Sequence, residues 1–176
     1  MRYLSVASLS LVITVAACER DRGSSDRAAN TVPNTDTIIP ATVHFVASLV
    51  EDGVVERRVP VDSNPGPYVV ERDIYADAQG LAAVLAPGSH IGNSAGRLSI
   101  DGRATSIDTH QHGNVTYASV RKLARELRGY ANFGPNGRDV TLWPGSRLCE
   151  YVRGADTRAE VYRGAAAEGL FAQCSR

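Results

Sequence analysis

Several features that identify common protein classes are missing from this 176-residue sequence. It has no net charge, because 19 basic residues balance 19 acidic ones. A neutral chain without a stripe of basic residues is not typical of nucleic-acid-binding proteins. Its N-terminal apolar run, Leu4 to Val15, is too short to span a membrane. We therefore expect one domain with a core of its own, whose main partner is not nucleic acid.

Motifs for catalysis are missing as well. The sequence has no Gly-x-Ser-x-Gly elbow and no glycine loop that would cradle a phosphate. His110-Gln111-His112 is its only metal-like spacing, since alternate residues of a strand face the same side. Two ligands do not complete a site, and His44 and His90 belong to other segments. We expect surface histidines in a loop, with no metal, no cofactor and no catalytic residue.

Acidic residues form the other candidate cluster. Asp101, Asp108 and Asp139 flank predicted strands and could meet in space. Acidic residues beside strands are usually solvated, so we expect a non-catalytic protein. A divergent envelope hydrolase or metal-dependent enzyme is the alternative, and a pocket in which histidines and aspartates converge would favour it. A shallow polar sheet face would instead favour a binding protein.

Residues 1–18 are typical of a targeting segment. Val15-Ala16-Ala17-Cys18 resembles the bacterial lipobox, in which the cysteine is the first mature residue and carries the lipid. The alternative is a plain secretory peptide with a cysteine there by chance. The resemblance implies acylation of Cys18, which would anchor the protein durably in a membrane. Because Glu19 is not the aspartate associated with inner-membrane retention, it also implies the outer membrane.

Residues 19–40 are polar and have almost no apolar side chain before Ile38. Such a segment cannot bury enough surface to offset its ordering entropy, which predicts a flexible linker. The folded part is then expected from residue 41. Alternating residues 43–49 predict a strand, and Asp52-Gly53 predicts a hairpin turn into a second strand at 54–61. Residues 63–67 have the composition of a loop.

The stretch from Asn114 to Leu142 predicts a strand, an amphipathic helix and two further short strands. The apolar residues of the helix recur at three and four positions and so share one face: Val120, Leu123, Ala124 and Leu127. Gly129 follows the helix and can supply the left-handed residue that ends it. Asn136-Gly137 predicts a turn into the closing strand at 139–142.

Three parts of the chain resemble a known family. Residues 116–127, TYASVRKLAREL, resemble the "TYVPLRxLAEAL" signature of the copper amine oxidase N-terminal-like domain. Residues 98–103 resemble the strand and turn before that signature in the family, and residues 140–142 resemble its closing strand. The resemblance covers about residues 41–142. It implies the stalk domain that occurs in many bacterial envelope proteins.

The sequence also departs from the family pattern. Ser119 stands where proline is usual, Arg125 stands where an acidic residue is usual, and Arg128 places the glycine one position later. Copper amine oxidases bind metal with a His-x-His pair in their catalytic domain and not in this N-terminal one. Their cofactor-forming Asn-Tyr-Asp/Glu-Tyr motif is absent from the sequence. The resemblance therefore implies no copper chemistry at His110 and His112.

A weak internal repeat appears when Tyr75 is placed on Tyr117, a shift of 42 residues. Leu81-Ala82 then falls on Leu123-Ala124, and the register continues without a gap through the following strands. Asp77 would cap the first helix, whose buried face would be Ala78, Leu81, Ala82 and Leu85. A chance likeness between two helices rich in alanine and leucine is the alternative to a duplication.

Residues 143–176 lie beyond the resemblance and are expected to form a C-terminal extension. Residues 148–152 predict a short strand, and Asp156 is expected to cap a helix from Thr157 to about Glu168. With Cys18 acylated, Cys149 and Cys174 are left as a pair, which predicts a disulfide in an oxidising compartment. We therefore predict an α+β fold with antiparallel strands wrapped around two short helices and a disulfide-stapled extension.

Arg121 is the residue for which the sequence supports a structural role and a ligand-binding role most nearly equally. It corresponds to the recurrent arginine in the first helical turn of the resembled family. It could pair with a backbone carbonyl or with Asp139, or present its guanidinium to a carboxylate of a glycan or peptide. We expect a non-catalytic outer-membrane lipoprotein that binds or scaffolds cell-wall polymer or another envelope protein. An inhibitor-like periplasmic lipoprotein is the further alternative.

Overall fold

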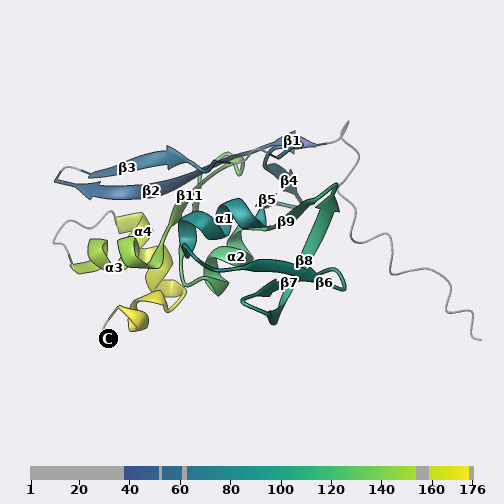
Figure 1. Ribbon diagram of the computed structural model, residues 1–176. Helices are drawn as coiled ribbons and strands as arrows, with labels where there is room; N and C mark the ends of the chain where they lie inside the picture. The colour runs from purple at the N-terminus through teal and green to yellow at the C-terminus, as the bar shows by residue number, and fades with distance from the viewer. Residues whose placement is uncertain (1–37, 52, 61–62, 154–158, 175–176) are drawn as a thin grey trace, which may run out of the picture.

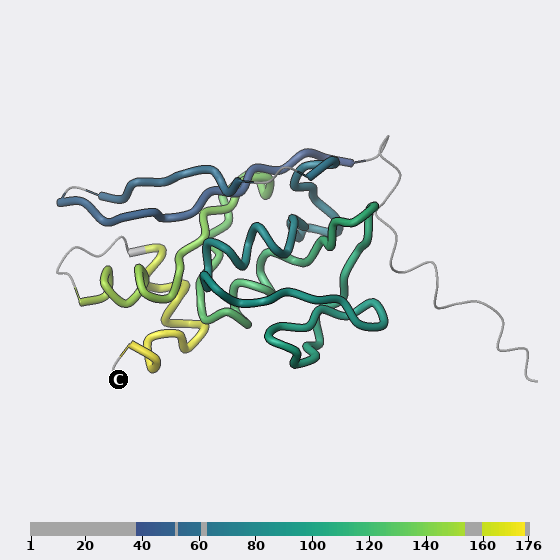
Figure 2. Tube along the Cα trace, viewed as in Figure 1, coloured from purple at the N-terminus to yellow at the C-terminus, as the bar shows by residue number. Residues whose placement is uncertain are grey.

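The computed structural model describes residues 38–51, 53–60, 63–153 and 159–174. Its fold is α+β, as predicted, with two mainly antiparallel sheets on either side of two short helices (Figure 1). A further group of helices from the C-terminal part of the chain covers one of these sheets (Figures 1 and 2). Cys18, the predicted signal segment and the predicted linker up to residue 37 lie outside the described residues.

The larger sheet has seven strands in the order β1-β4-β5-β9-β8-β7-β6, and all neighbouring strands are antiparallel. In that order the strands are Ile39–Pro40, Tyr68–Val70, Asp73–Asp77, Val115–Ser119, Arg103–His112, Arg97–Ile100 and Ile91–Ser94. Strand β1 lies within the segment that was predicted to be linker. Strand β8 contains residues that were predicted to form a loop. The prediction of a loop at His110 and His112 was therefore wrong.

The smaller sheet has four strands in the order β10-β11-β2-β3, namely Tyr130–Phe133, Asp139–Trp143, Thr42–Val50 and Gly53–Arg58. The β2–β3 pair is antiparallel and confirms the predicted hairpin, although Asp52 of its turn lies outside the described residues. Strands β11 and β2 are parallel. Because β1 and β2 are separated by Ala41 alone, residues 39–50 pass from the larger sheet directly into the smaller one.

Helices α1 (Ala78–Leu85) and α2 (Val120–Glu126) lie between the two sheets. Asp77 caps α1 by accepting from Gln79 N at 3.0 Å, and Ser119 caps α2 by accepting from Lys122 N at 3.1 Å. The predicted inward faces are buried, except that Leu127 is only half-buried. They pack against apolar residues of both sheets, including Ile74, Ala76, Leu98, Val140 and Leu142.

The end of α2 differs from the prediction. Arg128, and not Gly129, adopts the left-handed conformation, with φ of 58°. Gly129 is required for close packing instead, because a β-carbon there would lie 2.8 Å from both a Leu85 methyl group and the Trp143 carbonyl oxygen. Arg128 therefore adopts the left-handed conformation although it has a side chain. Gly129, which has none, allows α1 and β11 to approach closely at this point.

The C-terminal part of the chain forms α3 (Gly145–Arg153), α4 (Ala159–Ala167) and the 3₁₀ helix η3 (Leu170–Gln173). The strand predicted at residues 148–152 is wrong, because Leu148 and Tyr151 recur at helical spacing and are both buried. Helix α4 confirms a helix in the predicted region, although Asp156 and Thr157 lie outside the described residues. A second core joins these helices to the smaller sheet: Val46, Tyr130, Trp143, Leu148, Tyr151, Val161, Ala165 and Leu170.

Elements that the predicted 42-residue repeat relates pair with each other in the larger sheet. A shift of 42 residues, the separation of Tyr68 and His110, carries β5 onto β9, and it also carries Asp77 onto the other capping residue, Ser119. Strands β5 and β9 pair with each other so that the equivalent residues Ala76 and Ala118 lie opposite, flanked by Tyr75↔Ser119 and Asp77↔Tyr117. Exchanging the two halves therefore leaves the pairing unchanged, as expected for two units related by an approximate twofold axis.

Candidate functional site

A cluster of four rings lies on the face of the larger sheet that points away from α1 and α2. Ile74, Ala76 and Ala118 point toward the helices, so their strand neighbours point to the opposite face. That face carries four ring-bearing residues, two from each half of the chain: Tyr68, Tyr75, His110 and Tyr117. Tyr68 and Tyr117 are buried, whereas Tyr75 and His110 are half-buried.

The four rings are in direct contact. The Tyr75 and His110 rings stack with centroids 4.5 Å apart, and the Tyr68 and Tyr117 rings meet at 5.3 Å. The Tyr68 hydroxyl oxygen and His110 Nδ1 are 3.0 Å apart and form a hydrogen bond. The cluster thus ties β4 and β5 of the first half to β8 and β9 of the second.

Burial keeps the cluster uncharged. It raises the pKa of the Tyr68, Tyr75 and Tyr117 hydroxyls above the usual tyrosine value. Burial also lowers the pKa of the His110 imidazole, and the carboxylate of Asp108 partly opposes this shift. These shifts favour a neutral imidazole at His110, hydrogen-bonded to a protonated phenol at Tyr68.

The cluster positions a proline-rich loop, residues 63–67. The Tyr117 hydroxyl donates to the carbonyl oxygen of Pro65. Two residues later, the Pro67 carbonyl oxygen accepts from Ala41 N at 2.8 Å, at the point where the chain passes between the two sheets. The loop is therefore held both by the ring cluster and by the start of β2.

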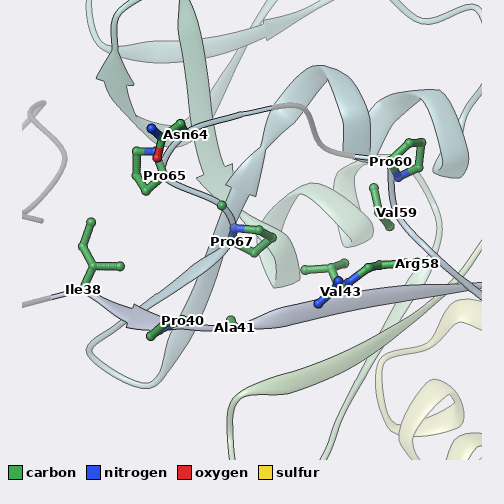
Figure 3. A pocket seen from close by; sticks show the side chains of 11 residues that line it. Ile38, Pro40, Ala41, Val43, Arg58, Val59, Pro60, Asn64, Pro65 and Pro67 are labelled. Atoms are coloured by element: carbon green, nitrogen blue, oxygen red, sulfur yellow. The ribbon is translucent and has the colours of Figure 1, made fainter.

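A groove of about 730 Å³ lies beside this loop (Figure 3). One side is the loop itself, with Asn64, Pro65, Gly66 and Pro67, and the other is the chain that leads into β2 and out of β3: Ile38, Pro40, Ala41, Val43, Arg58, Val59 and Pro60. The lining is mainly apolar, and its volume falls within the range of ligand sites. Of the described lining residues, Arg58 and Asn64 are the two with long polar side chains. Neither has an ion pair or a side-chain hydrogen bond to another described residue.

The predicted histidine pair lies in a strand and not in a loop. His110 belongs to the ring cluster, whereas His112 is exposed at the end of β8. In the described ranges, no group of three His, Cys, Asp or Glu side chains is arranged to hold a metal ion. The description of His110 as a surface histidine was therefore wrong, since its ring is stacked and hydrogen-bonded.

The three candidate aspartates have separate partners. Asp101 accepts from His90 N at 2.8 Å in the turn between β7 and β8. Asp139 pairs with the side-chain amide of Asn136 in the turn before β11. Asp108 acts electrostatically on Tyr75 and His110. The three aspartates therefore contact different residues and do not form one cluster.

Arg121 has a partner that the sequence did not suggest. Its guanidinium carbon lies 4.0 Å from the centroid of the Phe133 ring on β10. This cation–π contact joins the first turn of α2 to the smaller sheet. Among the described residues no ion pair joins Arg121 to Asp139.

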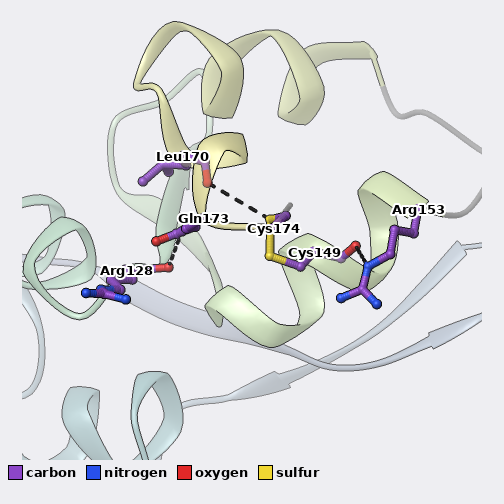
Figure 4. Close-up of a disulfide and its surroundings, with 6 residues drawn as sticks. All are labelled: Arg128, Cys149, Arg153, Leu170, Gln173 and Cys174. Carbon is purple, nitrogen blue, oxygen red and sulfur yellow. Dashed lines mark hydrogen bonds between the residues drawn. A yellow bond between two sulfur atoms is a disulfide. The ribbon is translucent and has the colours of Figure 1, made fainter. Parts of the chain in front are cut away.

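The predicted disulfide between Cys149 and Cys174 is present and joins α3 to the end of η3 (Figure 4). Polar contacts surround it. Arg153 donates from Nε to the Cys149 carbonyl oxygen at 3.2 Å, and Gln173 donates from its amide to the Arg128 carbonyl oxygen at 3.0 Å. The second contact holds the left-handed residue that ends α2, so the C-terminal segment is fastened to the domain at two points.

No protein-family model, curated protein or solved structure matches this chain. The resemblance to the copper amine oxidase N-terminal-like domain therefore stays a prediction. Within the described part of the chain, no helix is long and apolar enough to cross a membrane.

Neither the ring cluster nor the groove was predicted from the sequence. A usable signal existed for the cluster, because the shift that places Tyr75 on Tyr117 also places Tyr68 on His110. The groove had no such signal. Its residues come from three segments that meet only when the chain has passed from one sheet to the other.

Proposed function

We propose that this chain is a non-catalytic, lipid-anchored protein of the bacterial outer membrane whose folded domain binds a segment of another envelope protein. The groove beside residues 63–67 is the observation that carries this proposal. It combines an apolar lining with two polar side chains, Arg58 and Asn64, that have no side-chain partner among the described residues, which is the usual composition of a binding site. From the sequence, a shallow polar sheet face was expected to favour a binding protein. The site proposed here is an apolar groove instead.

The composition of the groove favours a polypeptide over cell-wall polymer. Pro40, Val43, Val59 and Pro67 offer apolar side chains to whatever lies against them. Sugar hydroxyls buried against such a surface would lose hydrogen bonds with water that these side chains cannot replace. Apolar side chains of an extended protein segment would lose nothing comparable and would gain from burial.

The N-terminal sequence supports an envelope location. A lipidated Cys18 would hold the protein at the membrane, and the polar segment that follows would place the domain roughly 25 Å away on average. The resemblance of residues 116–127 to the stalk-domain signature points to the same compartment. So does the Cys149–Cys174 disulfide, because disulfides persist where the surroundings are oxidising.

Site-specific photocrosslinking in intact cells tests the proposal. A photoreactive phenylalanine derivative replaces Asn64, an exposed residue of the groove, and in a control variant it replaces Glu160, an exposed residue of α4. We expect a discrete crosslinked product from position 64 that position 160 does not give. Protease should degrade the crosslinked partner. A crosslinked product that muramidase degrades would show that the partner is cell-wall polymer and not a protein. Identical products from both positions, or none from position 64, would contradict binding in the groove.

A further inference from the structure

One of the described residues that line the groove has a charged side chain. Arg58, the last residue of β3, lines it together with apolar residues and Asn64, and none of the described lining residues is acidic. Figure 3 shows its side chain extending from β3 toward Val43. Within the described residues Arg58 has no ion pair and no side-chain hydrogen bond. Among the described residues, the groove thus presents the positive charge of Arg58 beside an apolar surface.

We infer that the groove takes an extended polypeptide segment in which an acidic side chain, flanked by apolar residues, pairs with Arg58. This inference rests on the function proposed above and adds the chemistry of the ligand. A guanidinium presents a planar fork of donors that matches a carboxylate, so Arg58 recognises an acidic residue better than an amide of the same shape.

The lining also indicates how such a segment binds. Pro40, Pro60, Pro65 and Pro67 have no backbone N–H, and the backbone N–H groups of Ala41 and Val59 are already bonded to Pro67 and Val43. These residues therefore offer few backbone N–H donors to a bound segment. Apolar contacts supply the affinity, and Arg58 supplies the selection for charge.

The expected size of that selection follows from the exposure of Arg58. An ion pair at an exposed position contributes at most about 1 kcal/mol, which corresponds to about a fivefold change in affinity. The preference for an acidic over an amide ligand should therefore be about fivefold at low salt. It should shrink as salt screens the pair.

Two matched peptides test this inference. The probes are the blocked peptides Ac-Pro-Val-Glu-Val-Pro-NH₂ and Ac-Pro-Val-Gln-Val-Pro-NH₂, titrated into the isotope-labelled mature chain with Cys18→Ser. Amide shifts are followed by NMR, with the amides of Ala41, Val43, Val59 and Gly66 as reporters of the groove. We expect both peptides to move these amides, and the glutamate peptide to bind about fivefold more tightly.

Arg58→Gln should remove the difference between the two peptides. Arg57→Gln, at the neighbouring exposed residue that does not line the groove, should preserve it. Equal affinities in the wild-type protein would overturn the pairing with Arg58 and leave the groove as a binding surface. Shifts from a disaccharide-pentapeptide of the cell wall, with none from either linear peptide, would overturn both the inference and the protein partner. No groove shifts from any probe would overturn the inference, and the crosslinking experiment decides separately whether the groove binds a partner.

Discussion

The Tyr68 hydroxyl oxygen lies 3.0 Å from His110 Nδ1, and these two residues are related by the 42-residue shift of the predicted internal repeat. Each is opposite a tyrosine across a strand pair: Tyr68 faces Tyr75, and His110 faces Tyr117. The hydrogen bond therefore joins the halves at their approximate twofold axis. In one half the repeat position carries a phenol and in the other an imidazole, which makes a complementary donor and acceptor pair.

The ring cluster connects this axis to the groove. Tyr117 belongs to the cluster and also donates to the Pro65 carbonyl oxygen. The predicted 42-residue repeat thus relates more than two similar helices. It places four rings on one sheet face, and one of these rings fixes the loop that forms a wall of the proposed binding site.

The first prediction concerns the pH dependence of stability. Burial lowers the pKa of His110 in the folded protein, so the unfolded chain binds its proton more readily. The stabilisation from neutral His110 is complete above the unfolded value of about 6.5 and is lost as the pH falls through the lower folded value. Urea unfolding between pH 7.5 and pH 5 should therefore show decreasing stability, and His110→Gln should reduce this decrease.

His112→Gln is the control, since His112 lies two residues away on the same strand and is exposed. It should leave the pH profile of the wild-type protein unchanged. Asp108 is the charged group that opposes the shift, so Asp108→Asn should make the loss of stability at low pH steeper. An identical profile for the wild type and His110→Gln would show that the imidazole contributes nothing to the pH dependence.

The parts of the fold that the sequence predicted are those with local signals. Apolar spacing located α1 and α2, and the capping role of Asp77 followed from its position directly before the first apolar residue of the helix. The two remaining cysteines gave the disulfide. In each of these cases the residues that determine the structure lie close in sequence or belong to a scarce type.

The missed elements lack such signals or present mixed ones. Strand β8 carries only one large apolar residue, Ile107, although the β-branched residues Thr105, Ile107 and Thr109 alternate as in a strand. Helix α3 was mistaken for a strand because Leu148 to Val152 is short and apolar, and such runs fit either element. The groove depends on the change of sheet between β1 and β2, which no local pattern in the sequence describes.

The second prediction concerns the turn between β4 and β5. Glu71 and Arg72 both adopt positive φ, at 49° and 73°. Left-handed backbone costs an ordinary L-residue roughly 1 kcal/mol or more, and Asn-Gly suits a two-residue turn of this kind. The double variant Glu71→Asn, Arg72→Gly should therefore raise the free energy of unfolding by about 1–2 kcal/mol.

The equivalent turn in the second half serves as the matched control. Shifted by the repeat, Glu71 falls on Gly113, which has φ of 57° and open space around it. Gly113→Ala should lower stability by about 1 kcal/mol through backbone strain alone. Chemical denaturation measures both changes, and a destabilised Asn-Gly variant would show that Glu71 or Arg72 makes a contact worth more than the strain.

The third prediction concerns the packing of α4 on the smaller sheet. A β-carbon at Gly164 would overlap the hydroxyl group of Tyr130, whose ring belongs to the second core. Alanine is the better helix former, so propensity alone would favour Gly164→Ala by about 1 kcal/mol. Overpacking should outweigh this and destabilise the protein by about 1–3 kcal/mol. Tyr130→Phe combined with Gly164→Ala should recover part of the loss in thermal unfolding, and no recovery would contradict a clash with the hydroxyl group.

The fourth prediction concerns the disulfide. Cys149 and Cys174 are separated by 25 residues, and closing a loop of that length restricts the unfolded chain by about 3.5 kcal/mol on the chain-entropy model. The Cys149→Ser, Cys174→Ser variant should lose a few kcal/mol of stability in urea unfolding under non-reducing conditions. Reductant should destabilise the wild type by a similar amount and leave the variant unaffected. Equal stability of the two proteins without reductant would show that the second core holds the C-terminal helices unaided.

The fifth prediction concerns the anchor, on which the proposed location depends. If Val15-Ala16-Ala17-Cys18 is a lipobox, the mature protein begins at Cys18 and carries acyl chains there. Each buried methylene contributes about 0.8 kcal/mol to membrane binding, so several chains would keep the protein in the membrane fraction through a high-salt wash. Cys18→Ala should remove the lipid, and Cys149→Ser, Cys174→Ser should leave it in place, because those cysteines lie in the folded domain. Mass spectrometry of the N-terminal peptide is the measurement. An unmodified N-terminus at any residue other than Cys18 would contradict the lipid anchor and would leave the folded domain as a soluble binding protein.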